Sequence, residues 1–188
     1  MESRLLASAQ GGNAQAFEQL MTAYEKRIYC LCVRMLGNTH DGEDCAQEAM
    51  LRIWQKLPQY RGEAAFSTWV YRVTASLCMD ALRKRKDAQS LDALRETGFD
   101  AADEAPTPEE AQETRDMREA IAGALKTVPE GMRSVFLLRD VHGMSEAETA
   151  KALGLTKGTV KSRLARARGK MADSLRAQGI RGGECGAV

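Results

Sequence analysis

The stretch "SEAETAKALGLTKGTVKSRLARARGK", residues 145–170, decides the fold of the C-terminal part of the chain. It begins with the spacing of a capping box, in which Ser145 accepts a hydrogen bond from the backbone and Glu148 reaches back to the helix start. Gly154 then marks a helix end, and a second helical pattern begins at about Lys157. A short helix, a glycine turn and a second helix predict a helix-turn-helix.

The second helix of this motif separates apolar, small and cationic residues. At about 100° per residue, the apolar side chains share one face, small residues lie opposite, and Lys and Arg flank the small residues on both sides. A helix in the major groove needs a thin outer edge to approach the bases, while its sides meet the phosphate backbones. We interpret it as a DNA-binding helix; the alternative is a solvated basic helix. The apolar face is Val160, Leu164, Ala167 and Met171, and the opposite face is Gly158, Ser162, Ala165 and Gly169.

The net charge of +1 results from segments of opposite sign. Residues 1–86 carry twelve basic against nine acidic side chains (+3), and residues 87–116 carry two against ten (−8). Residues 150–181 carry nine against one (+8). Two basic parts separated by an acidic one predict a polyanionic partner.

Apolar residues spaced three and four apart predict helices along the chain, and no long strand pattern is present. We therefore expect an all-α protein of two small helical domains, residues 1–86 and 117–180, the second containing the helix-turn-helix. In the first domain, one continuous helix is expected over residues 14–36. Residues 87–116 predict a flexible acidic linker, and residues 181–188 a disordered tail.

The last expected helix of the first domain is basic and follows a group of aromatic residues. It ends in "RKRK", residues 83–86, and Phe66 and Trp69 lie at its start. Aromatic side chains beside a basic helix are typical of surfaces on which unpaired bases stack. The residues alone favour the other interpretation, in which Phe66 and Trp69 are core anchors of a small domain.

Two long blocks carry a family resemblance. Residues 41–86, "DGEDCAQEAMLRIWQKLPQYRGEAAFSTWVYRVTASLCMDALRKRK", and residues 128–168, "VPEGMRSVFLLRDVHGMSEAETAKALGLTKGTVKSRLARAR", resemble bacterial sigma factors of the extracytoplasmic-function type. The resemblance implies a protein, not itself an enzyme, that binds core RNA polymerase, directs it to a promoter and helps to open the DNA. A cytoplasmic location is expected from the lack of a membrane-spanning run or secretion signal in the sequence. It also implies regulation by an anti-sigma factor.

The resemblance also implies which residues act. The polymerase-docking residues are expected to be Asp41, Asp44, Gln47, Glu48 and Leu51. The residues expected to recognise and melt the minus-10 element are Phe66, Trp69, Arg72, Ser76, Asp80 and Arg83. The residues expected to contact the minus-35 duplex are Lys157, Thr159, Lys161, Ser162, Arg163, Arg166 and Arg168.

One position departs from the family pattern. Where these proteins often have an asparagine in the melting helix, this chain has Ser76. Asparagine offers an amide donor and a carbonyl acceptor, whereas serine offers one short hydroxyl. The base preference at the minus-10 element is therefore open.

Two alternatives remain. The first is a dimeric helix-turn-helix regulator that binds duplex DNA without polymerase. The second is a thiol-dependent enzyme or redox sensor built on Cys30 and Cys32, which have no second Cys or His pair at a metal-binding spacing. No metal or other cofactor is expected. The five cysteines are expected to be reduced, and no secretion signal or membrane-spanning run is evident.

Overall fold

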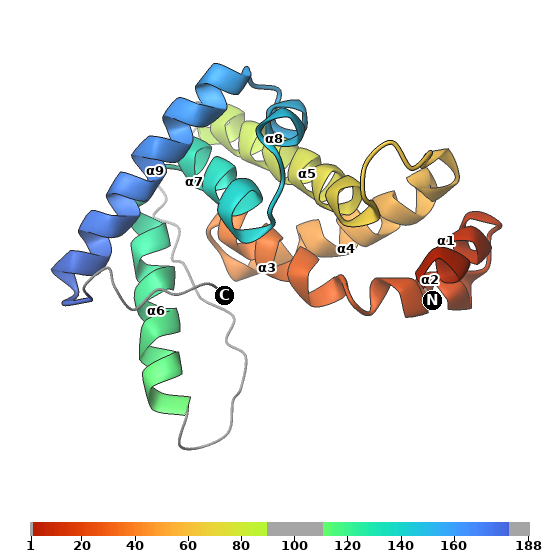
Figure 1. Cartoon of the computed structure of the whole chain (residues 1–188), viewed down its shortest axis with the longest axis horizontal. Helices are drawn as coiled ribbons and strands as arrows, with labels where there is room; N and C mark the ends of the chain where they lie inside the picture. Colours follow the sequence, from red (N-terminus) through yellow and green to blue (C-terminus); the bar gives the residue numbers. More distant parts are fainter. Residues whose placement is uncertain (1, 90–110, 181–188) are drawn as a thin grey trace.

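The computed structural model describes residues 2–89 and 111–180, and every regular element within them is helical (Figure 1). The all-α prediction and the helix-turn-helix are confirmed. The N-terminal elements are α1 (Glu2–Gln10), α2 (Ala14–Met21), α3 (Glu25–Leu36), α4 (Thr39–Lys56), the short 3-10 helix η1 (Leu57–Gln59) and α5 (Phe66–Gln89). The C-terminal elements are α6 (Ala111–Thr127), α7 (Glu130–Phe136), the π-helical segment η2 (Leu137–Val141), α8 (Glu146–Leu153) and α9 (Lys157–Ala177).

The helix expected over residues 14–36 is in fact two helices, α2 and α3. The chain turns between them and places the Tyr24 ring in the core, where the hydroxyl donates a hydrogen bond to Glu2 of α1 at 2.7 Å. Burial, together with this bond, raises the pKa of Tyr24. Helix periodicity continues across the break, so the apolar pattern did not predict it.

Helices α3 and α4 approach each other closely. Gly37 ends α3 in a left-handed conformation with φ 81°, and the Asn38 side chain caps α4 by accepting a hydrogen bond from the Asp41 backbone N–H at 2.7 Å. One turn into α4, Gly42 lies against Val33 of α3 with no room for a Cβ atom. Together with α5, this pair forms the core of the N-terminal part.

The C-terminal part follows the predicted turns. Gly154 ends α8 in a left-handed conformation with φ 64°, as predicted, and Gly143 also takes a left-handed conformation, with φ 66°. The apolar face expected on α9 is buried against α6 and α7, and the opposite face is exposed. Both ends of the expected linker are helical, in α5 and α6. The linker residues 90–110 and the tail 181–188 lie outside the described residues.

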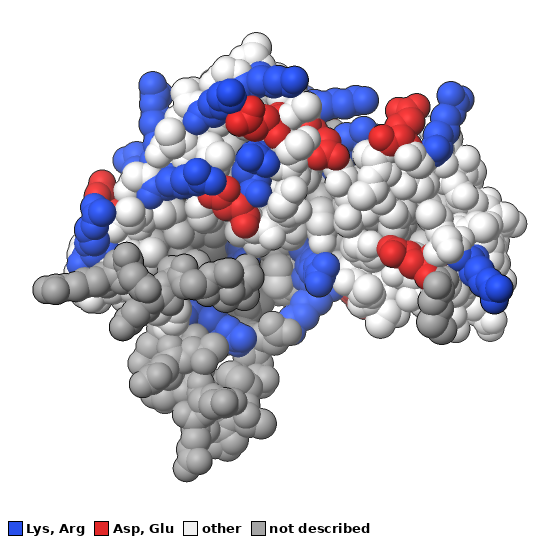
Figure 2. Space-filling model, viewed as in Figure 1, with Lys and Arg blue, Asp and Glu red and all other residues white. Residues whose placement is uncertain are grey.

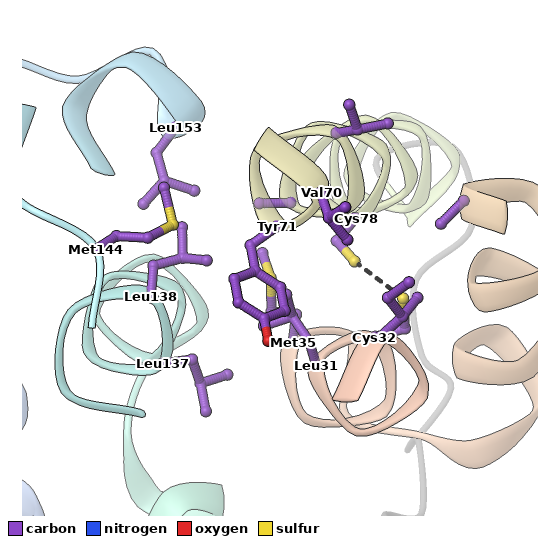
Figure 3. Packing of buried hydrophobic residues seen from close by; sticks show 14 of the residues in the cluster. Leu31, Cys32, Met35, Val70, Tyr71, Cys78, Leu137, Leu138, Met144 and Leu153 are labelled. Atoms are coloured by element: carbon purple, nitrogen blue, oxygen red, sulfur yellow. Dashed lines mark hydrogen bonds between the residues drawn. The ribbon is translucent and has the colours of Figure 1, made fainter. Parts of the chain in front are cut away.

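The N- and C-terminal parts pack directly on each other, which the sequence did not indicate. Helix α8 lies across α5 (Figure 1), and the Tyr71 ring contacts the His142 ring with centroids 4.2 Å apart. The buried Arg133 guanidinium donates a hydrogen bond to the Met35 carbonyl at 3.1 Å. Figure 3 shows apolar residues of the two parts facing each other: Leu137, Leu138, Met144 and Leu153 on one side, and Leu31, Met35 and Tyr71 on the other.

Helices of the described part are all too short or too polar to cross a membrane.

Candidate nucleic-acid and protein interfaces

The outer face of α9 is a narrow exposed ridge, which we call the recognition ridge: Gly158, Ser162, Ala165 and Gly169. The Thr156 side chain caps the helix by accepting a hydrogen bond from the Thr159 backbone N–H at 3.2 Å. Thr159 is half-buried, and its hydroxyl bonds to that of Thr156 at 2.9 Å. These bonds fix the start of α9.

The cations beside this ridge differ in how firmly the protein holds them. Arg168 forms a bidentate salt bridge with the Asp140 carboxylate, in which both hydrogen bonds are 2.7 Å long. This salt bridge raises the pKa of Arg168. The Lys161 ammonium is 3.6 Å from Glu146. The half-buried Arg163 donates a hydrogen bond to the Gly131 carbonyl at 3.4 Å.

The other two expected cations are free to meet a partner. Lys157 and Arg166 are exposed and form no ion pair within residues 2–89 and 111–180. Figure 2 shows Lys and Arg side chains gathered over the part of the molecule that α9 occupies in Figure 1, with a few acidic residues among them. Arg166 therefore presents an uncompensated charge next to the ridge.

The helix that precedes the recognition ridge is firmly capped. The Ser145 hydroxyl accepts a hydrogen bond from the Glu148 backbone N–H at 3.2 Å, and the Glu148 carboxylate accepts one from the Ser145 backbone N–H at 2.8 Å. These bonds lower the pKa of Glu148. The predicted capping box is confirmed.

The expected docking residues share the exposed side of α4. Asp41, Asp44, Gln47, Glu48 and Leu51 are all exposed, and we call this set the α4 docking surface. Leu51 keeps 58% of its surface exposed, although it is a large apolar residue. Beside it, Gln47 lines a surface pocket of about 360 Å³ between α3 and α4, which Ile28, Ala46 and Met50 also line. An apolar residue amid acidic ones, next to a pocket, favours a protein partner.

The expected minus-10 aromatics are core residues in this structure. Phe66 and Trp69 are each only 7% exposed. Their rings stack at 5.8 Å, and Tyr60 contacts Trp69 at 5.3 Å and Phe66 at 5.5 Å. Both rings are therefore core residues, as the residues alone favoured, and their stacking on bases stays a prediction of the resemblance.

The remaining minus-10 residues lie on the outer side of α5. Ser76, Asp80 and Arg83 are exposed, and Arg72 is half-buried. Asp80 and Arg83 pair with each other at 3.1 Å. Ser76 therefore stands on an open helix face, where a base edge could reach it.

Three cysteines form a cluster that their positions in the sequence did not predict. Cys32 of α3, Cys45 of α4 and Cys78 of α5 have their sulfur atoms within 4.8 Å of one another. Hydrogen bonds from Cys32 and Cys78 lower the pKa of the Cys45 thiol, and hydrogen bonds to Cys32 and Cys45 raise that of Cys78. Cys30, singled out with Cys32, lies outside the cluster. Only contact between helices brings these residues together, and their sequence spacing gave no signal.

Comparisons with known proteins cover both parts of the chain. Residues 20–88 match the family Sigma-70 region 2, and residues 118–171 match Sigma-70, region 4. The chain is 32% identical over 183 residues to the ECF RNA polymerase sigma factor SigW of Bacillus subtilis (strain 168), which covers 94% of this chain and 97% of that protein.

Solved structures have the same fold. One is the complex of CnrH with the cytosolic domain of CnrY, with a TM-score of 0.60, 26% identity, and coverage of 92% of this chain and 96% of that one. Another is the sigma factor RpoE in complex with the anti-sigma factor NepR from Bartonella quintana, with a TM-score of 0.67 and 19% identity. It covers 87% of this chain and 98% of that one, and at this identity supports the fold alone.

Proposed function

Because the chain belongs to the extracytoplasmic-function family of bacterial sigma factors, we propose that α4 docks on core RNA polymerase while α5 and α9 contact the two promoter elements. The protein directs promoter-specific initiation of transcription. It acts in the cytoplasm with the polymerase, which carries the chemistry, so the sigma factor itself is not an enzyme.

The exposed recognition ridge of α9 is the observation that carries the DNA-binding part of the proposal. Its small residues let the helix approach base edges. The exposed side chains of Lys157 and Arg166 are positioned beside them to contact phosphates or bases. We expect Arg166→Ala to weaken binding to the minus-35 duplex by about 1–3 kcal/mol if the guanidinium reaches a base. An equal loss on scrambled DNA would assign Arg166 to phosphate alone.

The exposed Leu51 supports the docking part of the proposal. Full burial of a leucine side chain contributes about 1.5–3 kcal/mol, and 58% of Leu51 remains to be covered. Leu51→Ala should therefore weaken core-polymerase binding by about 1–2 kcal/mol, or roughly 5- to 30-fold. Gln19→Ala, an exposed truncation on α2 outside the docking surface, serves as the control. Equal affinities of the two variants would contradict docking through α4.

The minus-10 part of the proposal relies on α5, with Arg72, Ser76, Asp80 and Arg83 on its accessible side. Phe66 and Trp69 support that helix from the core and contact DNA only if their cluster opens. Ser76→Asn would add an amide donor and acceptor at an exposed position, and we expect it to change the preferred minus-10 base. Sequencing of transcripts made by both proteins from a randomised minus-10 library measures this.

We also propose regulation by an anti-sigma factor. The similar sigma factor RpoE was solved bound to the anti-sigma factor NepR, and the exposed apolar Leu51 gives this chain a surface that such a partner could cover. Pull-down of this chain with candidate anti-sigma domains, with Leu51→Ala as the matched variant, tests whether that surface is used.

Run-off transcription from a pooled promoter library, with core polymerase alone and with this protein added, tests the whole function. Enrichment of a two-element consensus only when the protein is present is the expected result. If transcripts stay unchanged while the protein alone protects a palindromic duplex, the dimeric-regulator alternative replaces the proposal.

A further inference from the structure

The cluster of Cys32, Cys45 and Cys78 is the strongest group of ligand atoms that the proposed function leaves unused. The Cys45 and Cys78 sulfur atoms are 3.6 Å apart, and those of Cys78 and Cys32 are 3.7 Å apart. Cys32 and Cys78 are fully buried, and Cys45 is 8% exposed. Figure 3 shows Cys32 and Cys78 pointing at each other between α3 and α5.

The sulfur spacing suits a central atom bonded to three thiolates. Bonds of about 2.3 Å to one atom place the sulfurs roughly 3.3–3.5 Å apart in the pyramidal geometry of a trivalent metalloid and roughly 3.7–4.0 Å apart in tetrahedral or trigonal planar geometry. A disulfide instead requires about 2.05 Å, so a pair would have to close by about 1.6 Å. The Cys45–Cys78 and Cys78–Cys32 separations thus lie in the range that a three-coordinate central atom needs, and the Cys32 and Cys45 sulfurs lie within 4.8 Å of each other.

Charge decides which central atom fits. Two carboxylates, Asp41 and Glu48, act electrostatically on Cys45. Three thiolates around a monovalent or divalent ion would leave net negative charge in the core, which is unfavourable in a low-dielectric interior. Around a trivalent atom the complex is neutral. Zinc, besides, usually takes a fourth ligand, and the group contains three.

We propose that Cys32, Cys45 and Cys78 form a binding site for a trivalent thiophilic metalloid of the arsenite class. Arsenous acid, which is uncharged, exchanges its three hydroxyl groups for three thiolates; three S–H bonds break, three As–S bonds form, and three waters leave. No electron is transferred. Cys45, the one member with exposed surface, is the point of entry. The bound atom would link α3, α4 and α5 covalently and so stabilise the core beneath the docking surface.

Sodium arsenite added to a Cys30→Ser, Cys185→Ser protein tests the site, because only the three clustered thiols remain of the five cysteines. Native mass spectrometry should find one arsenic per chain with loss of three hydrogens, and thiol titration should find all three thiols consumed. The melting temperature should rise, because the ligand binds the folded state. Cys32→Ala, Cys45→Ala and Cys78→Ala, which keep the sites apolar, should each weaken binding at least tenfold.

The outcomes that overturn the proposal are equally specific. They are the absence of an adduct, an adduct of unchanged affinity in any of the three alanine variants, or a lowered melting temperature, which would place binding in the unfolded chain. Binding of zinc but not arsenite would refute the charge argument. Restoring Cys30 should change none of these results, because it lies outside the cluster. None of these measurements involves polymerase or promoter DNA. Their outcome therefore tests the metalloid site independently of the sigma function.

Discussion

Replacing Gly42 with alanine should destabilise the protein, because α3 and α4 meet at this residue. A Cβ atom there would lie 2.5 Å from the Val33 Cγ2 and 2.8 Å from the Val33 Cα, whereas ordinary contact begins at 3.4 Å. The Cγ2 can rotate away, but the Cα cannot. The helices would therefore have to separate by about 0.6 Å at the backbone, the difference between 3.4 and 2.8 Å.

The size of the effect follows from two opposing terms. Overpacking of this kind costs about 1–3 kcal/mol, and replacing a helical glycine with alanine returns about 0.5–1 kcal/mol. We expect a net loss of about 1–2 kcal/mol, which lowers the melting temperature by roughly 2–8 °C in a chain of this size. Circular dichroism during heating measures it.

Gly169→Ala is the matched control. Gly169 is also inside a helix, α9, but a Cβ atom there meets nothing within 4 Å. This variant should gain about 0.5–1 kcal/mol and melt at a higher temperature. Shifts of opposite sign support the close approach of α3 and α4; if Gly42→Ala melts as high as Gly169→Ala, the reasoning is refuted.

Three further predictions concern the C-terminal part. Burial, and then repulsion by the arginines of α3, lowers the pKa of His142 from 6.5 to about 4; the unfolded chain binds the proton first, so stability should fall as the pH drops from about 6.5 to about 4. Because the ring keeps some exposure, the free energy of unfolding should fall by about 1–2 kcal/mol over this pH range. The urea unfolding midpoint of a His142→Gln variant should not show this fall. Ser145→Ala removes the capping box and should lower the free energy of unfolding by about 0.5–2 kcal/mol, measured by thermal melts. Ser145→Asp keeps a side-chain acceptor at this position and should retain most of that stability. Asp140→Ala releases Arg168 from its two-pronged bond and should tighten duplex binding and steepen its salt dependence by about one unit; unchanged salt dependence would remove Arg168 from the DNA-binding set.

Much of the fold could be predicted because its information is local. Buried faces repeat every three to four residues, which identifies the helices, and the turns use residues with one conformational role, such as Gly154 with its positive φ and the Ser145 cap. The faces of α9 follow from helix geometry alone, since Val160 and Leu164 had to be buried together.

The features that escaped prediction depend on contacts between distant segments. The packing of Tyr71 on His142 and the convergence of three cysteines require knowing how helices lie on one another, which periodicity does not specify. For Phe66 and Trp69 the residues alone favoured the core position that the structure shows, and contact with bases was implied only by the resemblance, since a ring can serve either role with the same neighbours in sequence. From their residue types alone, the acidic residues of α4 predict only a solvated helix face. The structure adds that Leu51, a large apolar residue, is exposed among them.

Helix α4 serves both the core and a partner, and its geometry keeps the two roles separable. Leu51 projects about 160° away from Ala49 and about 120° from Cys45, both of which are buried. Truncating Leu51 therefore removes surface that only a partner would cover, whereas filling the space at Gly42 moves the whole helix relative to α3. A core change that displaces α4 should weaken polymerase binding in proportion to its loss of stability, while Leu51→Ala should weaken binding with stability unchanged. The ratio of the two effects in each variant distinguishes a residue that contacts the polymerase from one that merely positions the helix.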